Sequence, residues 1–301
     1  MSQKNILITG AEGFIAINLA SYLSKKHFNI FGIGNKKFEK KISSKFGYKF
    51  LLNSKVNKKN LKKNFGGIDL IIHCAGSGIV GLNKQENYKK NFLTTKGILD
   101  FSRNEKKKPR IIFMSSYSIY GNSYLKAIKE NCKPKPLSSY AITKRDSENI
   151  LLKYSKLYCL DITILRLASI YGNGLKKQLI FDTCNKIRNN KNIFYGTGNE
   201  IRDWLHISDL CTLVYKVIIK SSEKKIINCG SGKGNKVKTI IGFIKKEFNS
   251  TTKIKYVMKK NKEAKVLKTN INLAKSFGWY PKISLKKGIL KYVRWYKKIY
   301  D

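Results

Sequence analysis

The stretch Ile6-Leu7-Ile8-Thr9-Gly10-Ala11-Glu12-Gly13-Phe14-Ile15-Ala16 decides the fold of this chain. A short apolar run leads to Gly10, and an apolar-periodic segment follows Gly13, so the pattern predicts a strand, a tight turn and a helix. Gly10 permits the turn, Gly13 lets the backbone approach a pyrophosphate, and the small Ala16 lets helix and strand pack closely. The free N–H groups at the helix start would face an anion. The turn therefore predicts a dinucleotide site, with cofactor contacts at Gly10, Glu12, Gly13, Phe14 and Ile15.

Short apolar runs alternate with longer periodic segments beyond this turn. Strands are predicted at residues 5–8, 29–33, 69–74, 110–115, 161–167 and 226–229, and helices at 14–25, 88–103, 138–157, 176–189 and 208–219. The runs at 68–72 and 111–114 are almost continuously apolar, as strands buried on both faces are. We therefore expect an α/β fold, a doubly wound parallel sheet (Rossmann) with a smaller C-terminal substrate-binding lobe.

The alternation fades after residue 167, where Gly, Asn and Lys become frequent. The C-terminal part carries one strand signal at 252–257 and a closing helix near 285–300. We expect an NAD(P)-binding domain over 1–168, to which a segment at about 204–230 returns. Residues 169–203 and 231–301 are then expected to form the substrate-binding lobe.

The composition is globular but strongly basic. The 301 residues include 62 Lys and Arg against 18 Asp and Glu, a formal net charge of +44. The basic residues are spread along the chain, which favours a compositional background over a dedicated polyanion site. The alternative from another class is an idle Rossmann module that binds nucleic acid or an anionic membrane surface through the aromatic and basic segment 292–298. We expect no specific nucleic acid and no integral membrane association.

Cysteines and the N-terminus indicate a cytoplasmic protein. The six cysteines never form a CxxC pair and the chain has three histidines, so we expect reduced thiols and no metal site. No apolar stretch approaches the ~18 residues of a membrane span, and no signal peptide is expected.

The second predicted strand should end in an acidic residue if it binds the adenosine ribose of NAD. The sequence there is Gly34-Asn35-Lys36-Lys37, without a carboxylate. This favours NADP slightly over NAD as the cofactor, with Asn35 and Lys36 as contacts. The alternative is that these lysines are simply solvated, which leaves NAD open.

Tyr140 and Lys144 lie four residues apart, hence on one face of a helix and about 6 Å apart along its axis. A nearby ammonium favours the phenolate, so we expect the pKa of Tyr140 to fall toward neutrality and allow proton exchange with a sugar hydroxyl. Ser116 follows the strand at 110–115, at the sheet edge where such folds bind ligands. Its hydroxyl would hold the substrate oxygen beside Tyr140.

These motifs occur together and in order, and the chain resembles the extended short-chain dehydrogenase/reductase superfamily. Within it, the chain is similar to the NAD(P)-dependent epimerase/dehydratase group that acts on nucleotide sugars, as UDP-glucose 4-epimerase-like proteins do. Residues 9–16 resemble its TGxxGFIG, with Ala16 for the last glycine, and 69–76 its DxxxHxAA loop. Further matches are 115–121 to SSxxVYG, 140–144 to YxxxK, 165–172 to LRxxNVYG, 202–209 to RDFVHVDD and 277–281 to LGWxP.

The resemblance implies roles for individual residues. Ser116, Tyr140 and Lys144 would be catalytic, with Tyr140 as the acid and base and Lys144 its modulator, also bonding the cofactor ribose. Arg202 would meet the substrate diphosphate, although an ion pair with Asp203 is the alternative. Ser169 stands where asparagine is usual and would contact the substrate. The remaining cofactor contacts implied are Ala75, Gly76 and Asn91, and family members usually form homodimers.

The reaction within that group follows from what is missing. Dehydratases carry an Asp-Glu pair after the catalytic hydroxyl, because removal of water needs an extra acid and base. Tyr117 and Ser118 stand there instead. We expect C4 epimerisation of a UDP-hexose through a transient 4-keto intermediate, an isomerase more than a net oxidoreductase. The alternative is a 4-keto-sugar nucleotide reductase that consumes NADPH.

Overall fold

The computed structural model describes residues 3–34, 45–76, 84–121, 127–220, 225–258 and 266–301. The chain forms two compact units. Unit 1 comprises residues 1–119, 138–166 and 221–227, and unit 2 comprises residues 120–137, 167–220 and 228–301. Segments 120–137 and 204–220 thus pack within unit 2, whereas the sequence analysis places them in the dinucleotide-binding domain. The division by function remains a prediction.

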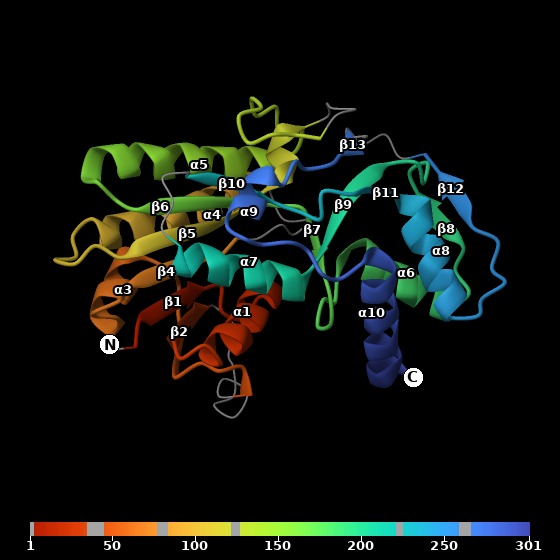
Figure 1. The fold of residues 1–301 in the computed structure, drawn as a ribbon, viewed down its shortest axis with the longest axis horizontal. Helices are drawn as coiled ribbons and strands as arrows, with labels where there is room; N and C mark the ends of the chain where they lie inside the picture. The colour runs from red at the N-terminus through yellow and green to blue at the C-terminus, as the bar shows by residue number, and fades with distance from the viewer. Residues whose placement is uncertain (1–2, 35–44, 77–83, 122–126, 221–224, 259–265) are drawn as a thin grey trace. The chain divides into compact units, whose positions relative to one another are not determined.

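A seven-stranded sheet forms the centre of the Rossmann part, in the strand order β10-β6-β5-β4-β1-β2-β3 (Figure 1). Strands β1, β2, β3, β4 and β5 pair in parallel. The order reverses between β1 and β4, which is the point where doubly wound sheets bind ligands. The predicted fold class is confirmed. The strands are β1 (Asn5–Thr9), β2 (Asn29–Gly34), β3 (Phe50–Asn53), β4 (Leu70–His73), β5 (Arg110–Ser116), β6 (Ile162–Leu167) and β10 (Ile226–Cys229).

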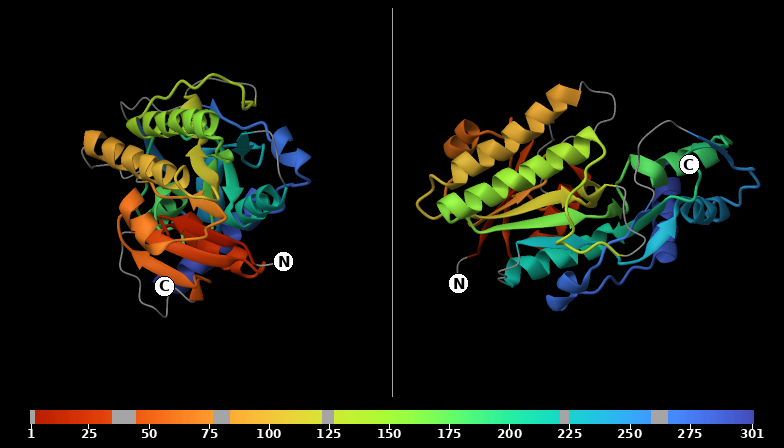
Figure 2. Two further views of the ribbon diagram at one scale, coloured as in Figure 1. Left: turned by 90° about the vertical axis from the view of Figure 1, so that its left-hand side faces the viewer. Right: turned by 90° about the horizontal axis from the view of Figure 1, so that it is seen from above.

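Alternate strand residues supply the two faces of this sheet. Leu7, Ile71 and Ile111 are fully buried in one apolar cluster, together with Leu61 and Ile98 from helices on that face. Figure 2 shows α4 (Lys84–Ser102) and α5 (Ser139–Tyr158) side by side over the sheet, and α3 (Lys58–Asn64) packs against α4. Helix α1 (Phe14–Ser24) packs on β1 and β2 and buries Ala16, Leu19, Ala20 and Leu23.

Unit 2 is built around β9 (Ile201–His206), which pairs with β7, β11 and β13. The buried side chains of Asp203 and Asp209 tie it together through hydrogen bonds described below. The sequence predicts four of its elements, which are α6 (Gln178–Arg188), α7 (Ile207–Ile219), β12 (Lys255–Val257) and α10 (Leu285–Tyr300). The elements that were not predicted are, besides β9, β7 (Ser169–Tyr171), β8 (Ile193–Tyr195), β11 (Gly234–Lys236), α8 (Val237–Glu247), β13 (Val266–Leu267) and α9 (Asn272–Ser276).

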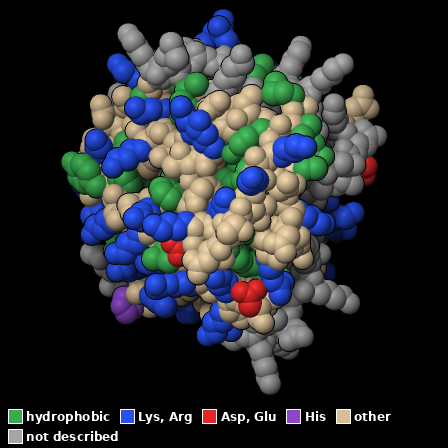
Figure 3. All heavy atoms as spheres, turned by 90° about the vertical axis from the view of Figure 1, so that its right-hand side faces the viewer, with side chains coloured by type: hydrophobic (Ala, Val, Ile, Leu, Met, Phe, Trp, Pro, Cys, Tyr) green, Lys and Arg blue, Asp and Glu red, His purple; other side chains and the backbone are tan. Residues whose placement is uncertain are grey.

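The face drawn in Figure 3 is basic over much of its area. Lys and Arg side chains are scattered there among apolar and neutral atoms, with few acidic ones. All six cysteines are free thiols. Among the described residues, no helix is long and apolar enough to cross a membrane, and no cluster of three or more His, Cys, Asp or Glu side chains could hold a metal ion.

Candidate active site

The glycine turn lies against the loop that follows β4. Gly10 has φ +65°, and a Cβ built on it would lie 2.8 Å from the Cα of Ala75. The N–H of Ala75 donates to the Thr9 hydroxyl over 3.2 Å, and the N–H of Gly13 donates to the Gly10 carbonyl over 2.8 Å. Only glycine fits at position 10, for both conformation and space. The predicted contacts Gly10, Gly13 and Ala75 thus form one cradle at the start of α1, a shape that suits the pyrophosphate of a dinucleotide.

His73 joins this cradle to helix α4. It is fully buried, and its ring nitrogens hydrogen-bond with the hydroxyls of Thr9 at 2.8 Å and Thr95 at 3.0 Å. Burial, with a contribution from Lys144, lowers the pKa of His73 to about 3. The ring is therefore neutral at physiological pH and acts as a structural link, not as an acid or base.

Ser116 ends β5 and carries a hydroxyl next to that of Tyr140. The residue is 8% exposed, and its hydroxyl hydrogen-bonds with Tyr140. It also lies 2.9 Å from the hydroxyl of Ser118. Tyr140 is placed in the first turn of α5 by Ser138, whose hydroxyl accepts a hydrogen bond from the N–H of Ala141 and caps the helix. The structure brings Ser116 and Tyr140 together as predicted, and Ser118 is an additional hydroxyl.

Lys144 lies one turn further along α5 and is 7% exposed. Its ammonium donates to the carbonyl of Met114 on β5 over 2.7 Å and lies 4.6 Å from the centre of the Phe113 ring. A Cβ built on Gly76 would lie 3.3 Å from Nζ, so Lys144 faces the loop that contacts the glycine turn. Burial lowers the pKa of Lys144 to about 8, against smaller opposing effects of Cys74 and Glu148.

The expected fall in the pKa of Tyr140 is wrong for this structure. Burial of the hydroxyl raises the pKa of Tyr140, and the hydrogen bond from Ser116 opposes this only in part. The Lys144 ammonium lies 5.9 Å from the centre of the Tyr140 ring and donates to a carbonyl instead. Tyr140 as a whole residue is 36% exposed.

A buried ion pair supports this group, and the sequence analysis missed it. Glu148, one turn after Lys144, accepts hydrogen bonds from Arg166 over 2.8 Å and from the Ser115 hydroxyl over 2.5 Å. Glu148 and Arg166 are 2% and 3% exposed. The (i, i+4) spacing from Lys144 on α5 was the available signal, because it places Glu148 on the same helix face.

The other predicted residues lie elsewhere or outside the described part. Asn35 and Lys36 lie outside the described residues. Phe14 and Ile15 begin α1, and Asn91 is half-buried within α4.

Ser169 and Arg202 belong to unit 2. Ser169 pairs with Trp204 across β7 and β9, so by strand alternation Ser169 and Arg202 share one face of that sheet. The Asp203 carboxylate is held by the N–H groups of Ser231 and Gly232 and by hydroxyl groups, not by Arg202.

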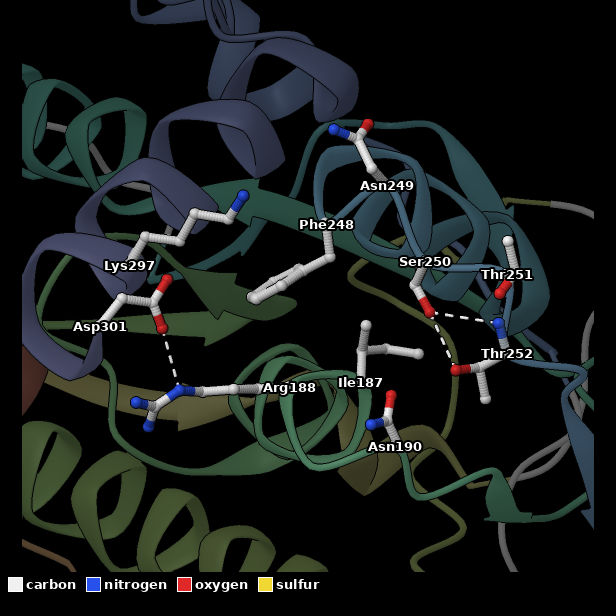
Figure 4. Close-up of a pocket in the computed structure, with 10 residues that line it drawn as sticks. All are labelled: Ile187, Arg188, Asn190, Phe248, Asn249, Ser250, Thr251, Thr252, Lys297 and Asp301. Carbon is white, nitrogen blue, oxygen red and sulfur yellow. Dashed lines mark hydrogen bonds and ion pairs between the residues drawn. The ribbon is translucent and has the colours of Figure 1, made fainter.

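A surface cavity of about 470 Å³ lies within unit 2, between α6, α8 and α10 (Figure 4). Arg188 forms an ion pair of 2.9 Å with Asp301 at one side, and Ser250 and Thr252 hydrogen-bond at the other. None of the predicted site residues lines this cavity.

The sequence profile of the NAD-dependent epimerase/dehydratase family matches residues 6–230. The chain belongs to this family. It is 27% identical over 311 residues to UDP-glucuronate 4-epimerase of Thermodesulfobacterium geofontis, covering 97% of this chain and 96% of the relative. It is 25% identical over 328 residues to dTDP-D-glucose 4,6-dehydratase of Bos taurus, covering 98% and 89%.

A solved structure has the same fold. It is a mutant UDP-glucuronic acid 4-epimerase from Bacillus cereus in complex with UDP-4-deoxy-4-fluoro-glucuronic acid and NAD. The TM-score is 0.90, over 98% of this chain and 100% of that one, at 22% identity. The motifs of unit 1 thus lie in an epimerase/dehydratase-type Rossmann fold, as the sequence predicts.

Proposed function

We propose that the protein is a 4-epimerase of a UDP-hexose that works with a bound nicotinamide dinucleotide. The observation that carries this proposal is the Ser116–Tyr140 hydroxyl pair at the carboxyl end of β5, with the Lys144 ammonium buried on the same helix. Two hydroxyls and an ammonium can move one proton on and off a sugar hydroxyl. The names of the relatives support the same reaction and substrate class.

The residues of this chain would divide the work. Tyr140, as phenolate, takes the proton of the sugar O4 while Ser116 holds that oxygen by a hydrogen bond. A nicotinamide dinucleotide held at the glycine turn would supply the hydride acceptor and donor for C4, so that a 4-keto sugar that turns over receives the hydride on its other face. Tyr140 then gives the proton back, so no net oxidation results. The charge of Lys144 would favour this phenolate and oppose the effect of burial, which raises the pKa of Tyr140. Arg202 and Ser169 would bind the diphosphate and the sugar.

Dehydration is the less favoured reaction. It needs an acid and a base to remove water from the sugar in addition to the tyrosine. At the two positions after Ser116 the chain has Tyr117, which is 7% exposed, and Ser118, which hydrogen-bonds with Ser116. Neither side chain carries a carboxylate.

The experiment is to incubate the purified protein with UDP-glucose, UDP-galactose, UDP-glucuronate and their N-acetyl counterparts, with no added cofactor. Interconversion of a 4-epimer pair, followed by NMR over many turnovers, is the expected result. Strict dependence on stoichiometric NADPH and a 4-keto sugar would show the reductase alternative instead. Inactivity together with tight nucleic-acid binding at roughly physiological salt would favour the idle Rossmann module. The homodimer and the cytoplasmic location remain predictions.

A further inference from the structure

The Glu12 carboxylate lies at the carboxyl end of β2. A Cβ built on Gly34, the last residue of β2, would lie 1.8 Å from Oε2 of Glu12 and 2.8 Å from its carboxyl carbon. The carboxylate therefore fills the direction in which a side chain at position 34 would point. Glycine at this position leaves the room that the carboxylate occupies.

Hydrogen bonds on the residue before it hold Glu12 in place. The N–H of Ala11 donates to the carbonyl of Ile33 on β2 over 3.2 Å. The carbonyl of Ala11 accepts from the hydroxyl of Tyr48 over 3.0 Å. Burial raises the pKa of Tyr48, and the charges of Cys74 and Glu12 raise it further, so Tyr48 stays a neutral donor. The turn is thus fastened to β2 directly beside Glu12.

The end of the second strand is where dinucleotide-binding folds recognise the adenosine ribose. An acidic residue there accepts a hydrogen bond from the ribose 2′-hydroxyl and repels a 2′-phosphate. The sequence analysis favours NADP because Gly34-Asn35 offers no acid. That premise is wrong, because the structure brings a carboxylate to the same place from the first glycine turn.

We propose that Glu12 is the residue that selects NAD over NADP. Its carboxylate accepts hydrogen bonds from the ribose hydroxyls and disfavours a 2′-phosphate at the same point. This inference rests on the proposed function, since it takes the glycine turn to bind the cofactor. Glu12 is half-buried beside the N-terminus of α1, and its Oε2 atom is buried.

Mutation can move the carboxylate from position 12 back to position 34, the end of β2. Gly34 is not among the glycines with positive φ, and apart from Glu12 its nearest neighbour to a Cβ is the Ala11 nitrogen at 3.4 Å. Aspartate therefore fits at position 34 once the Glu12 side chain is shortened. The variants are Glu12→Gln, Glu12→Ala and the double variant Glu12→Ala with Gly34→Asp. Glu105→Gln, after the end of α4, is the charge-matched control.

The measurement is the Kd of NAD⁺ and of NADP⁺ on the full chain, by calorimetry without sugar, after resident nucleotide has been removed and identified. We expect the wild type to prefer NAD⁺ and Glu12→Gln to reduce the Kd ratio by about tenfold or more. Glu12→Ala should do the same, the double variant should restore the preference, and Glu105→Gln should keep it.

A wild-type preference for NADP⁺, or a ratio unchanged in Glu12→Gln, overturns the inference. Thermal unfolding of each variant shows whether it is folded. If Glu12→Ala is unstable, the test is whether the double variant regains the preference for NAD⁺. If the wild type epimerises UDP-hexoses but fails this test, only the role of Glu12 is rejected. A wild type that binds neither nucleotide loses the proposed function.

Discussion

Glu148 in unit 1 and Asp203 in unit 2 are both buried carboxylates, and their partners differ in kind. Glu148 is paired with the guanidinium of Arg166. Asp203, fully buried, accepts hydrogen bonds from N–H and hydroxyl groups of Ser231, Gly232 and Thr269. Asp209 likewise binds the backbone N–H groups of residues 282 and 283.

The difference follows what each region does. Unit 1 keeps charged groups beside a titratable lysine, as the proposed proton transfer at Tyr140 would require. In unit 2 the buried carboxylates of Asp203 and Asp209 accept hydrogen bonds from backbone N–H groups of loops. These neutral donors hold the loops near β9. Substitutions in the two regions should therefore fail in different ways.

The largest effect on turnover is expected for Tyr140→Phe, which tests whether unit 1 contains the residue that transfers the proton. Loss of the hydroxyl should lower turnover by about 10²- to 10⁴-fold, since proton transfer is lost. Unfolding free energy and cofactor binding should stay near the wild type. Tyr158→Phe, near the other end of α5, is the control and should retain activity. A Tyr140→Phe enzyme with more than a tenth of wild-type turnover would contradict the assignment.

Arg166→Leu should be the most destabilising change. It leaves the Glu148 carboxylate buried without its guanidinium, at a cost of about 3–5 kcal/mol. Urea unfolding at neutral pH measures this loss. Replacing both residues, as Glu148→Gln with Arg166→Met, should cost less than the single change because no buried charge remains. Equal or greater loss in the double variant would mean that packing, not charge, sets the cost.

Lys144→Met tests the burial of the ammonium through pH. The folded-state pKa of about 8 lies below the unfolded value of 10.5, so the folded state binds fewer protons between these values. Wild-type stability from this group is therefore lowest below pH 8 and recovers as pH rises to 10.5, by roughly 3 kcal/mol. The unfolding free energy of Lys144→Met minus that of the wild type should fall by this amount over that window. For the control Lys156→Met, an exposed position, the same difference in unfolding free energy should not change with pH. A difference for Lys144→Met that does not change with pH would contradict the burial of the ammonium.

The smallest effect is expected for Asp203→Asn in unit 2. The amide keeps the shape and one acceptor oxygen but turns the other acceptor into a donor facing N–H groups, at about 1–3 kcal/mol. Chemical denaturation, with the exposed Asp161→Asn as control, measures it. Turnover per folded molecule should be retained at saturating substrate. A loss of turnover as large as that of Tyr140→Phe would indicate a catalytic role for Asp203 and contradict the purely structural role assigned to the carboxylates of unit 2.

The sequence predicts the Rossmann core well because its signals are local. Strand β1, the turn and α1 are within a residue or so of their predicted bounds. Strand β3 was missed because its apolar run, Phe50-Leu51-Leu52, is only three residues long and the strand is exposed at both ends. Helix α3 buries only Leu61 and therefore has no periodicity, although Asn57 caps its start.

The site divides in the same way. Ser116, Tyr140 and Lys144 belong to motifs that occur together and in order, so the sequence singles them out as candidates. The pairing of Glu148 with Arg166, and of the Glu12 carboxylate with Gly34, joins residues from different elements. Such contacts depend on how the strands and helices pack, which no local pattern contains. The sign of the Tyr140 pKa shift was mistaken for this reason, since burial of the hydroxyl outweighs the hydrogen bond from Ser116.

Thr9 and Thr95 determine which atom is the donor in each hydrogen bond of the series that joins Ala75, Thr9, His73, Thr95 and Asn91. The N–H of Ala75 donates to the Thr9 hydroxyl, and Thr95 donates to the carbonyl of Asn91 over 3.2 Å. The Thr9 hydroxyl must then give its hydrogen to Nδ1, and Nε2–H must give its own to Thr95, which fixes one imidazole tautomer. Reversing any one link would set two donors or two acceptors face to face. The loop beside the glycine turn is thus polarised from Ala75 toward α4 before any ligand arrives.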